Sequence, residues 1–235
     1  MIPSIRRYIH VLRDEGPLAG LELAMLRFGS ALLGQDRAYF GLIKMTDRWY
    51  DWRTGLDTGG AASHAEIEID PQTGRDYLAT TPRAWSGLMR HLPIEPQKFT
   101  YIDLGCGKGR TLVLAANWGF RRVIGVDLSE PMAAAAESNV AKSGAAGVEI
   151  VRGNAGEYQF PDGPLVLFLY NPFWSKVNEC VAGNLHVSVT RKPREVYVVY
   201  WRPLLKEIWD KTASLELYKQ CDALYPWYAI YRSRS

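Results

Sequence analysis

From residue 99 onwards, short apolar runs alternate with longer segments of helical spacing, and this alternation constrains the fold more than any other feature. The run at residues 165–170 is almost wholly apolar, which is typical of a strand buried on both faces of a sheet. Strands that alternate with helices predict a doubly wound α/β fold built around a mostly parallel sheet.

Seven strands are expected in this part of the chain, separated by helices. The strands are expected at residues 99–104, 122–127, 148–152, 165–170, 195–201, 215–221 and 227–232, and the helices at 110–118, 131–142, 174–187 and 203–211. The link at residues 224–226 is too short for a crossover helix, so the last two strands are expected to pair antiparallel.

The chain before Pro96 has a different character. Residues 1–95 are expected to form a helical extension or cap, and residues 96–235 the main domain. Apolar residues at helical spacing predict a helix that carries Leu18, Leu21, Met25, Phe28 and Leu32 on one face. Thr81-Pro82 predicts a further helix start, with Thr81 as the N-cap.

Two short features lie between these helices. Ile67 and Ile69 alternate with glutamates and indicate a short strand. Gly59-Gly60 could act as a hinge, so the segment 52–60 is interpreted either as a lid over a site or as a surface loop.

Composition excludes several classes of protein. The 28 basic and 25 acidic side chains contain no run of like charge, so a nucleic-acid-binding patch is not expected. The three cysteines are far apart, which predicts neither a disulfide framework nor a metal site and suits the cytoplasm. The most apolar stretch, residues 18–33, is interrupted by charges and shorter than the ~20 residues of a membrane span.

The segment Asp103-Leu104-Gly105-Cys106-Gly107-Lys108-Gly109-Arg110 carries the chemistry. It lies where an expected strand turns into an expected helix, and its glycines permit a tight turn and the close approach of a ligand. Asp127, at the end of the next strand, could accept hydrogen bonds from both hydroxyls of a ribose.

Three ligands compete for this turn, beside the interpretation of a glycine-rich turn without any ligand. A dinucleotide site would need Gly-x-Gly-x-x-Gly, and Asp103 would repel its pyrophosphate. A P-loop would need Ser or Thr after Lys108, where the chain has Gly109. S-adenosylmethionine has no phosphate and carries two cationic groups, so it fits the charge of Asp103 best.

These residues resemble the first motif of the class I, Rossmann-like, S-adenosylmethionine-dependent methyltransferases, and Val126-Asp127-Leu128 resembles the second. The resemblance covers residues 77–235 and implies a seven-stranded sheet of order 3-2-1-4-5-7-6 with the last strand antiparallel. Gly153-Asn154-Ala155 stands where many members have Gly-Asp-Ala, which implies that Asn154 faces the adenine amino group. The implied cofactor-binding residues are Asp103, Gly105, Cys106, Gly107, Gly109, Asp127, Leu128, Asn154, Ala155 and Asn171.

Asn171-Pro172-Phe173-Trp174 is similar to the Asn/Asp-Pro-Pro-Tyr/Phe motif of methyltransferases that act on amino nitrogens, although it has a single proline. The resemblance makes these four residues candidates for orienting the acceptor, and it implies methyl transfer to an amino nitrogen of a protein lysine or a small molecule. Asn171 could instead only shape the cofactor pocket. The alternative function is a noncatalytic binding protein that keeps the fold. No general base is assigned, with Asp57, Tyr77 and Tyr170 as candidates, and no metal is expected.

Overall fold

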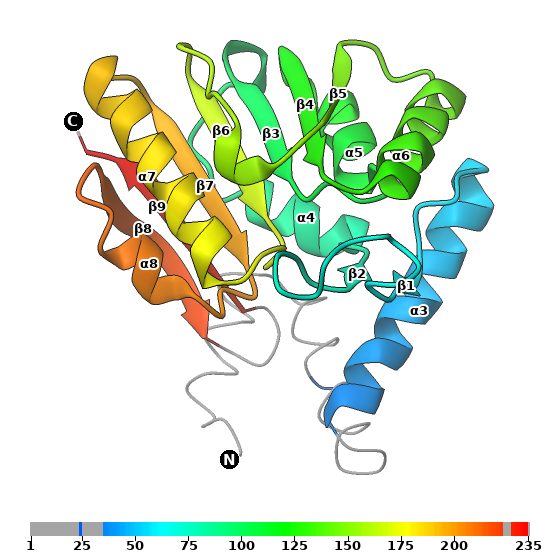
Figure 1. The fold of residues 1–235 in the computed structure, drawn as a ribbon. Coiled ribbons are helices and arrows are strands. Elements are labelled where there is room, and N and C mark those ends of the chain that lie inside the picture. The colour runs from blue at the N-terminus through cyan, green and yellow to red at the C-terminus, as the bar shows by residue number, and fades with distance from the viewer. Residues whose placement is uncertain (1–23, 25–34, 223–226, 235) are drawn as a thin grey trace.

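A computed structural model describes residue 24 and residues 35–222 and 227–234 of the chain. The link at 224–226 and, apart from residue 24, the predicted helix at residues 18–32 lie outside the described residues. A seven-stranded sheet of order β5-β4-β3-β6-β7-β9-β8 forms the centre (Figure 1). Its strands are β3 (Thr100–Leu104), β4 (Arg122–Asp127), β5 (Val148–Arg152), β6 (Leu165–Leu169), β7 (Val196–Trp201), β8 (Leu215–Asp222) and β9 (Trp227–Ser233).

The predicted fold class is confirmed. Counted from β3, the strand order is 3-2-1-4-5-7-6. The pairs of β3 with β4 and β6, of β4 with β5 and of β6 with β7 are parallel, whereas β9 runs antiparallel to both β7 and β8. The last two strands, β8 and β9, therefore pair antiparallel, as expected from the short link between them.

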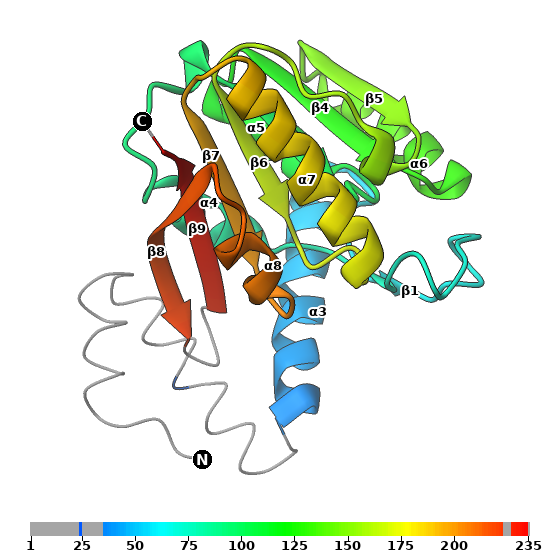
Figure 2. The ribbon, with the colours of Figure 1, turned by 60° about the vertical axis from the view of Figure 1, so that its left-hand side comes forward.

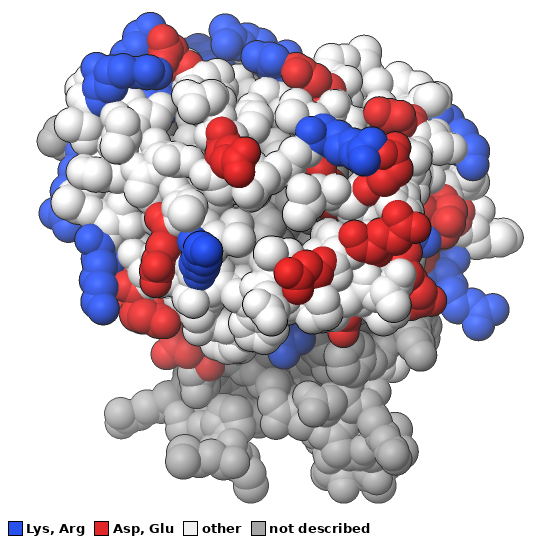
Figure 3. Space-filling view, in the orientation of Figure 1, with Lys and Arg blue, Asp and Glu red and all other residues white. Residues whose placement is uncertain are grey.

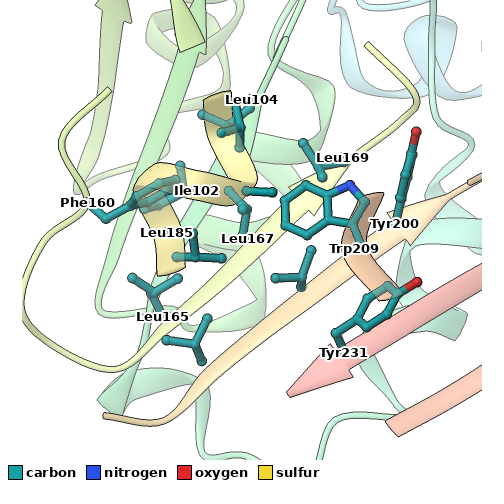
Figure 4. Close-up of a cluster of buried hydrophobic side chains, with 14 of the residues drawn as sticks. Ile102, Leu104, Phe160, Leu165, Leu167, Leu169, Leu185, Tyr200, Trp209 and Tyr231 are labelled. Atoms are coloured by element: carbon teal, nitrogen blue, oxygen red, sulfur yellow. The ribbon is translucent and has the colours of Figure 1, made fainter. Parts of the chain in front are cut away.

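Helices cover both faces of the sheet (Figure 2). They are α4 (Pro82–Met89), α5 (Arg110–Trp118), α6 (Glu130–Ser143), α7 (Ser175–Arg191) and α8 (Lys206–Asp210). Alternate residues of each strand enter two apolar cores: Tyr101 lies in the core beneath α4 and α5, and Ile102 in the core beneath α7 and α8. Figure 4 shows the second core, where Trp209 of α8 packs among aromatic and leucine side chains of the sheet.

The segment before the sheet contains α3 (Gln35–Thr54) and a two-stranded ribbon, β1 (Ala61–Ala62) with β2 (Tyr77–Leu78). The strand predicted at Ile67 and Ile69 is wrong, because these residues lie in a series of turns. Glu66 accepts hydrogen bonds from the backbone N–H and hydroxyl of Ser63, which reverses the chain here. Ile67 is buried for another reason: it lines a pocket at the carboxyl ends of the strands.

Arg110, the first residue of α5, fastens α3 to the main sheet. Its guanidinium is buried and pairs with Asp47 and, at 3.3 Å, with Asp51 of α3, while its Nε donates to the Thr58 hydroxyl at 2.8 Å. An arginine at a helix N-terminus adds charge where the helix dipole is already positive. The two aspartates of α3 supply the opposite charge.

The predicted helix after Thr81 is α4, and the Thr81 hydroxyl accepts from Ala84 N at 3.2 Å. α4 packs into the main core through Trp85, whose Nε1 donates to the Tyr101 hydroxyl at 2.8 Å. The domain boundary expected at residue 96 stays a prediction. The packing nevertheless joins α4 to the sheet.

The described surface carries both signs of charge. On the face drawn in Figure 3, acidic and basic side chains are interspersed over the described residues, without a continuous basic stripe. None of the described helices combines the length and apolarity needed to cross a membrane.

Candidate active site

The glycine-rich turn after β3 depends on backbone conformations that favour glycine. Gly105 and Gly107 have φ of +79° and +52°. A Cβ on Gly105 would lie 2.6 Å from Pro172 Cβ, and one on Gly107 would lie 2.1 Å from the Tyr77 ring. Gly105 N and Cys106 N donate to Val126 O at 2.8 and 3.2 Å, which ties the turn to the end of β4.

Asp127, the last residue of β4, is held against this turn. Its Oδ2 accepts from Gly107 N at 2.7 Å, and its Oδ1 accepts from Ser129 N at 2.9 Å. Burial raises the pKa of Asp127, and these N–H groups oppose the rise by favouring the carboxylate. Each oxygen keeps accepting capacity, so two further hydroxyl donors can still be bound.

A pocket of about 830 Å³, counted to its open mouth, lies at the carboxyl ends of the strands. Open α/β sheets bind ligands at this edge. Predicted residues that line the pocket are Gly105, Gly107, Asp127, Leu128, Asn154, Ala155, Pro172 and Phe173. Asp103, Cys106, Gly109, Asn171 and Trp174 are not among the lining residues.

Asp103 and Cys106 border a smaller neighbouring cavity, which shares Tyr77, Gly105 and Tyr170 with the main pocket. Burial raises the pKa of Asp103 to about 7, against the opposing hydrogen bond from the Thr111 hydroxyl. A cationic group of a ligand here would favour the ionised carboxylate. Gly109 has a packing role, because a Cβ on it would lie 3.0 Å from Ala136 Cβ of α6.

Residues 63–76 cover the pocket, and we call this segment the strap. Arg75 N donates to Pro172 O at 3.1 Å, Gly74 forms a β-bridge with Phe173, and Trp174 Nε1 donates to Pro71 O at 2.8 Å. In Figure 1 the ribbon of β1 and β2 passes below the carboxyl ends of the sheet. The strap supplies pocket residues that sequence reasoning missed, namely Ile67, Ile69, Thr73, Gly74, Arg75 and Asp76. Leu78 of β2 was also missed, whereas its neighbour Tyr77 was a candidate base.

The segment 52–60, interpreted as a lid or a surface loop, docks beside α5 and α6 instead of closing the pocket. Asp57 N donates to Asn139 Oδ1 at 3.0 Å, and the exposed Asp57 carboxylate pairs with Lys108 at 3.1 Å. Asp57 is not among the pocket residues, which removes it as a candidate base. Burial raises the pKa of Tyr77 far above its usual value, and its hydroxyl donates to Thr58 O at 2.7 Å, so this phenol stays neutral.

Asn171 and Asn154, both predicted to bind the cofactor, form hydrogen bonds within the protein. Asn171 is buried with φ of +46°, and its Oδ1 accepts from the Tyr200 hydroxyl at 3.0 Å. Asn154 Oδ1 accepts from Gly156 N at 2.9 Å, which caps the short 3-10 helix η2 (Ala155–Glu157). Both amide oxygens can accept a second hydrogen bond, so the predicted roles of the two residues stay predictions.

Comparison with known proteins assigns a chemistry to this geometry. Residues 102–180 match the profile of a family described as a methyltransferase domain. The matched segment runs from β3 through the glycine-rich turn and Asp127 into α7. The chain thus carries a methyltransferase domain within a sheet of the Rossmann-like strand order, and S-adenosylmethionine is the cofactor that the motif resemblance implied.

Solved structures share the fold. The ribosomal protein L11 methylase from Lactobacillus delbrueckii subsp. bulgaricus is 17% identical with a TM-score of 0.52, over 71% of this chain and 83% of that chain. A SAM-dependent methyltransferase from Aquifex aeolicus is 14% identical with a TM-score of 0.51, over 63% and 88%. A predicted N6-adenine-specific DNA methylase from Listeria monocytogenes is 16% identical with a TM-score of 0.51, over 66% and 51%.

The residues of the pocket fit S-adenosylmethionine. Gly105 and Gly107 leave the backbone of the turn open, and Asp127 offers two oriented oxygens to a ribose. Leu128, Met132, Ala155 and Val177 supply an apolar wall where a purine ring could lie. Asp103, which borders the neighbouring cavity, can provide negative charge for the cationic methionine end when it is ionised.

Proposed function

We propose that this methyltransferase transfers the methyl group to an amino nitrogen, and that the turn at Asn171–Trp174 orients the acceptor. The proposal rests on one observation: Pro172 and Phe173 line the same pocket as the glycine-rich turn and Asp127. An acceptor that reaches the turn after β6 would therefore lie beside the methionine end of the cofactor.

Aromatic side chains support this assignment. Phe173, Tyr170 and Tyr77 line the pocket, and Trp174, 40% exposed, lies at the same turn. Aromatic faces stabilise cationic centres, and N-methylation passes through a positively charged nitrogen. The carbonyl of Pro172 accepts a single backbone donor from Arg75, so a lone pair remains for an acceptor N–H.

The cofactor supplies a methyl group bound to a sulfonium sulfur. In the proposed step the nitrogen lone pair forms the new N–C bond, while the electron pair of the S–C bond remains on sulfur as a thioether. The nitrogen must reach the site deprotonated or lose its proton before attack. The protein contributes alignment, because two reactants held in line avoid most of the entropic cost of meeting.

The acceptor class can be tested with a labelled methyl donor in a cell extract. The products are separated into protein, RNA and small molecules, and the label is challenged with alkali, which cleaves methyl esters and leaves N-methyl groups intact. We expect alkali-stable label, and mass spectrometry of the digested product should place the methyl group on nitrogen. Label found on oxygen or carbon contradicts the proposal.

Asn171 provides a second test, once an acceptor is known. Asn171→Gly removes the amide and tolerates the positive φ, so it is preferable to Asn171→Ala. We expect kcat/KM for the acceptor to fall by at least ~10-fold while the Kd of S-adenosylhomocysteine changes by less than ~3-fold, the pattern of an interaction made in the transition state. An equal loss in both constants would place Asn171 in the cofactor pocket instead.

The cytoplasmic location is likewise proposed, from the cysteines. Cys106 and Cys180 are free thiols, and such thiols are typical of reducing compartments. Cell fractionation with a tag at the C-terminus tests this location.

A further inference from the structure

Arg75 has an uncompensated charge at the mouth of the pocket. Its guanidinium carbon lies 3.7 Å from the centre of the Trp174 ring, and its Nε is buried without a hydrogen-bond partner. Among the described residues, no carboxylate forms an ion pair with this guanidinium. The neighbouring Asp76 instead contacts His64, with 2.7 Å between Oδ1 and Nδ1.

A partly buried guanidinium without a counter-charge costs free energy unless an anion binds to it. A partly buried cation loses hydration, and burial lowers the pKa of Arg75 accordingly. Stacking on an indole face compensates part of this loss but leaves the Nε–H of the guanidinium without a hydrogen-bond partner. The N–H donors of a guanidinium form a rigid, planar fork that matches the two oxygens of a carboxylate or phosphate.

The position of Arg75 identifies the end of the pocket that it serves. Its backbone N–H binds Pro172 O, and its side chain covers Trp174, so it belongs to the turn that follows β6. Asp127 follows β4, and β3 separates β4 from β6 in the sheet. Arg75 therefore lies at the acceptor end, two strands away from the carboxylate proposed for the ribose.

We propose that Arg75 binds an anionic group, a carboxylate or a phosphate, of the methyl acceptor. The proposal rests on the proposed function only in assigning the turn after β6 to the acceptor. It narrows the substrate class to molecules or side chains that carry a nucleophile and an anion a short distance apart. The Trp174 ring fixes the plane of the guanidinium, which makes Arg75 a determinant of specificity.

The test uses the full-length protein saturated with S-adenosylhomocysteine and two probes, inorganic phosphate and acetate. Binding is followed by the indole N–H resonance of Trp174, which Trp174→Phe assigns. We expect at least one of the two anions to shift this resonance saturably, and the stronger one identifies the anionic group. Arg75→Gln should weaken the binding by at least ~10-fold, the loss of a charge-assisted pair, and Arg75→Lys by less.

Arg90 provides a matched control, because it is an exposed arginine that lies outside the pocket. Arg90→Gln should bind the anion like the wild type. The proposal is overturned if neither anion binds the wild type, or if Arg75→Gln and Arg75→Lys both bind as the wild type does. It is also overturned if Arg75→Gln weakens S-adenosylhomocysteine as strongly as the anion, because Arg75 would then serve the cofactor. Anion binding needs no methyl transfer, so it can succeed even where N-methylation fails.

Discussion

Asp127 links the ribose site to the glycine-rich turn through its two carboxylate oxygens. Asp127→Ala should weaken the binding of S-adenosylhomocysteine by about 1.5–3 kcal/mol, the value of hydrogen bonds to a charged group. Titration calorimetry on the folded variant measures this loss. Asp162→Asn, which alters an exposed carboxylate on the surface, is the control. An unchanged Kd in folded Asp127→Ala would exclude this residue from the ribose site.

Asp103 should make cofactor binding depend on pH. Its pKa of about 7 means that the ligand-free protein is mostly protonated at this residue at about pH 6 and ionised at about pH 8. A cationic methionine end favours the carboxylate, so the affinity should rise with pH over this interval, until the ammonium group itself loses its proton near pH ~8. Asp103→Asn should flatten the rise, as measured by calorimetry at three pH values.

The same residue should affect stability, with the opposite sign. The folded protein keeps a proton on Asp103 that the unfolded chain has lost above pH ~4, so the stability contribution of Asp103 falls as pH rises from about 4 to about 7. Asp103→Asn removes this contribution. If the difference in free energy of unfolding between the variant and the wild type does not change with pH, the raised pKa is wrong.

The buried ion pair between Arg110 of α5 and Asp47 of α3 should contribute more to stability than an exposed ion pair does. Removing one partner leaves the other charge buried and uncompensated, so Arg110→Ala and Asp47→Asn should each cost about 3–5 kcal/mol of unfolding free energy. Arg122→Ala, which breaks the half-exposed pair with Glu149, should cost about 0–1 kcal/mol. Denaturant unfolding of the three variants compares them. Equal costs would show that the burial of Arg110 carries no particular energy.

The elements from residue 99 onwards could be predicted because their limits are set locally. Helix α5 covers the predicted residues 110–118 and lies between Gly109 and Gly119, both in the left-handed region, and strand β4 has its predicted limits at 122 and 127. The strand predicted at Ile67 and Ile69 failed because two apolar residues in alternation do not distinguish a strand from successive turns. Hydrogen bonds from Ser63 to Glu66 stabilise turns at this position instead of a strand.

The pocket could be predicted only in part, for a similar reason. Its glycines, Asp127 and Asn154 follow strands in contiguous motifs, and strand ends of a parallel sheet meet at one edge. The strap residues carry no motif, and only the chain reversal at residues 63–74 brings Arg75 to Pro172. Asn171 was expected at the pocket but is not among its lining residues, and its Oδ1 accepts from the Tyr200 hydroxyl, a contact between two strand ends that spacing does not reveal.

Among the described residues, the core beneath α5, the pocket and the ion pairs of Arg110 join the two parts of the chain. Trp85, Leu88 and Met89 of α4 are buried in the core beneath α5, and strap residues line the pocket together with residues between 105 and 177. Burial of each large apolar side chain contributes about 1.5–3 kcal/mol. Domains are stable by only about 5–15 kcal/mol, so losing all three would remove most of that stability.

Two fragments therefore test where the folding unit begins. Residues 80–235 keep Thr81 and α4 but lack the strap, so this fragment should unfold cooperatively and bind S-adenosylhomocysteine more weakly than the full chain. Residues 96–235 lack α4 and leave the Tyr101 hydroxyl without its Trp85 donor, so this fragment should show no cooperative transition. Circular dichroism melts and calorimetry compare the two. A cooperative melt of residues 96–235, with a cofactor Kd equal to that of the full chain, would instead support the predicted boundary and give residues 1–95 no part in the core or the pocket.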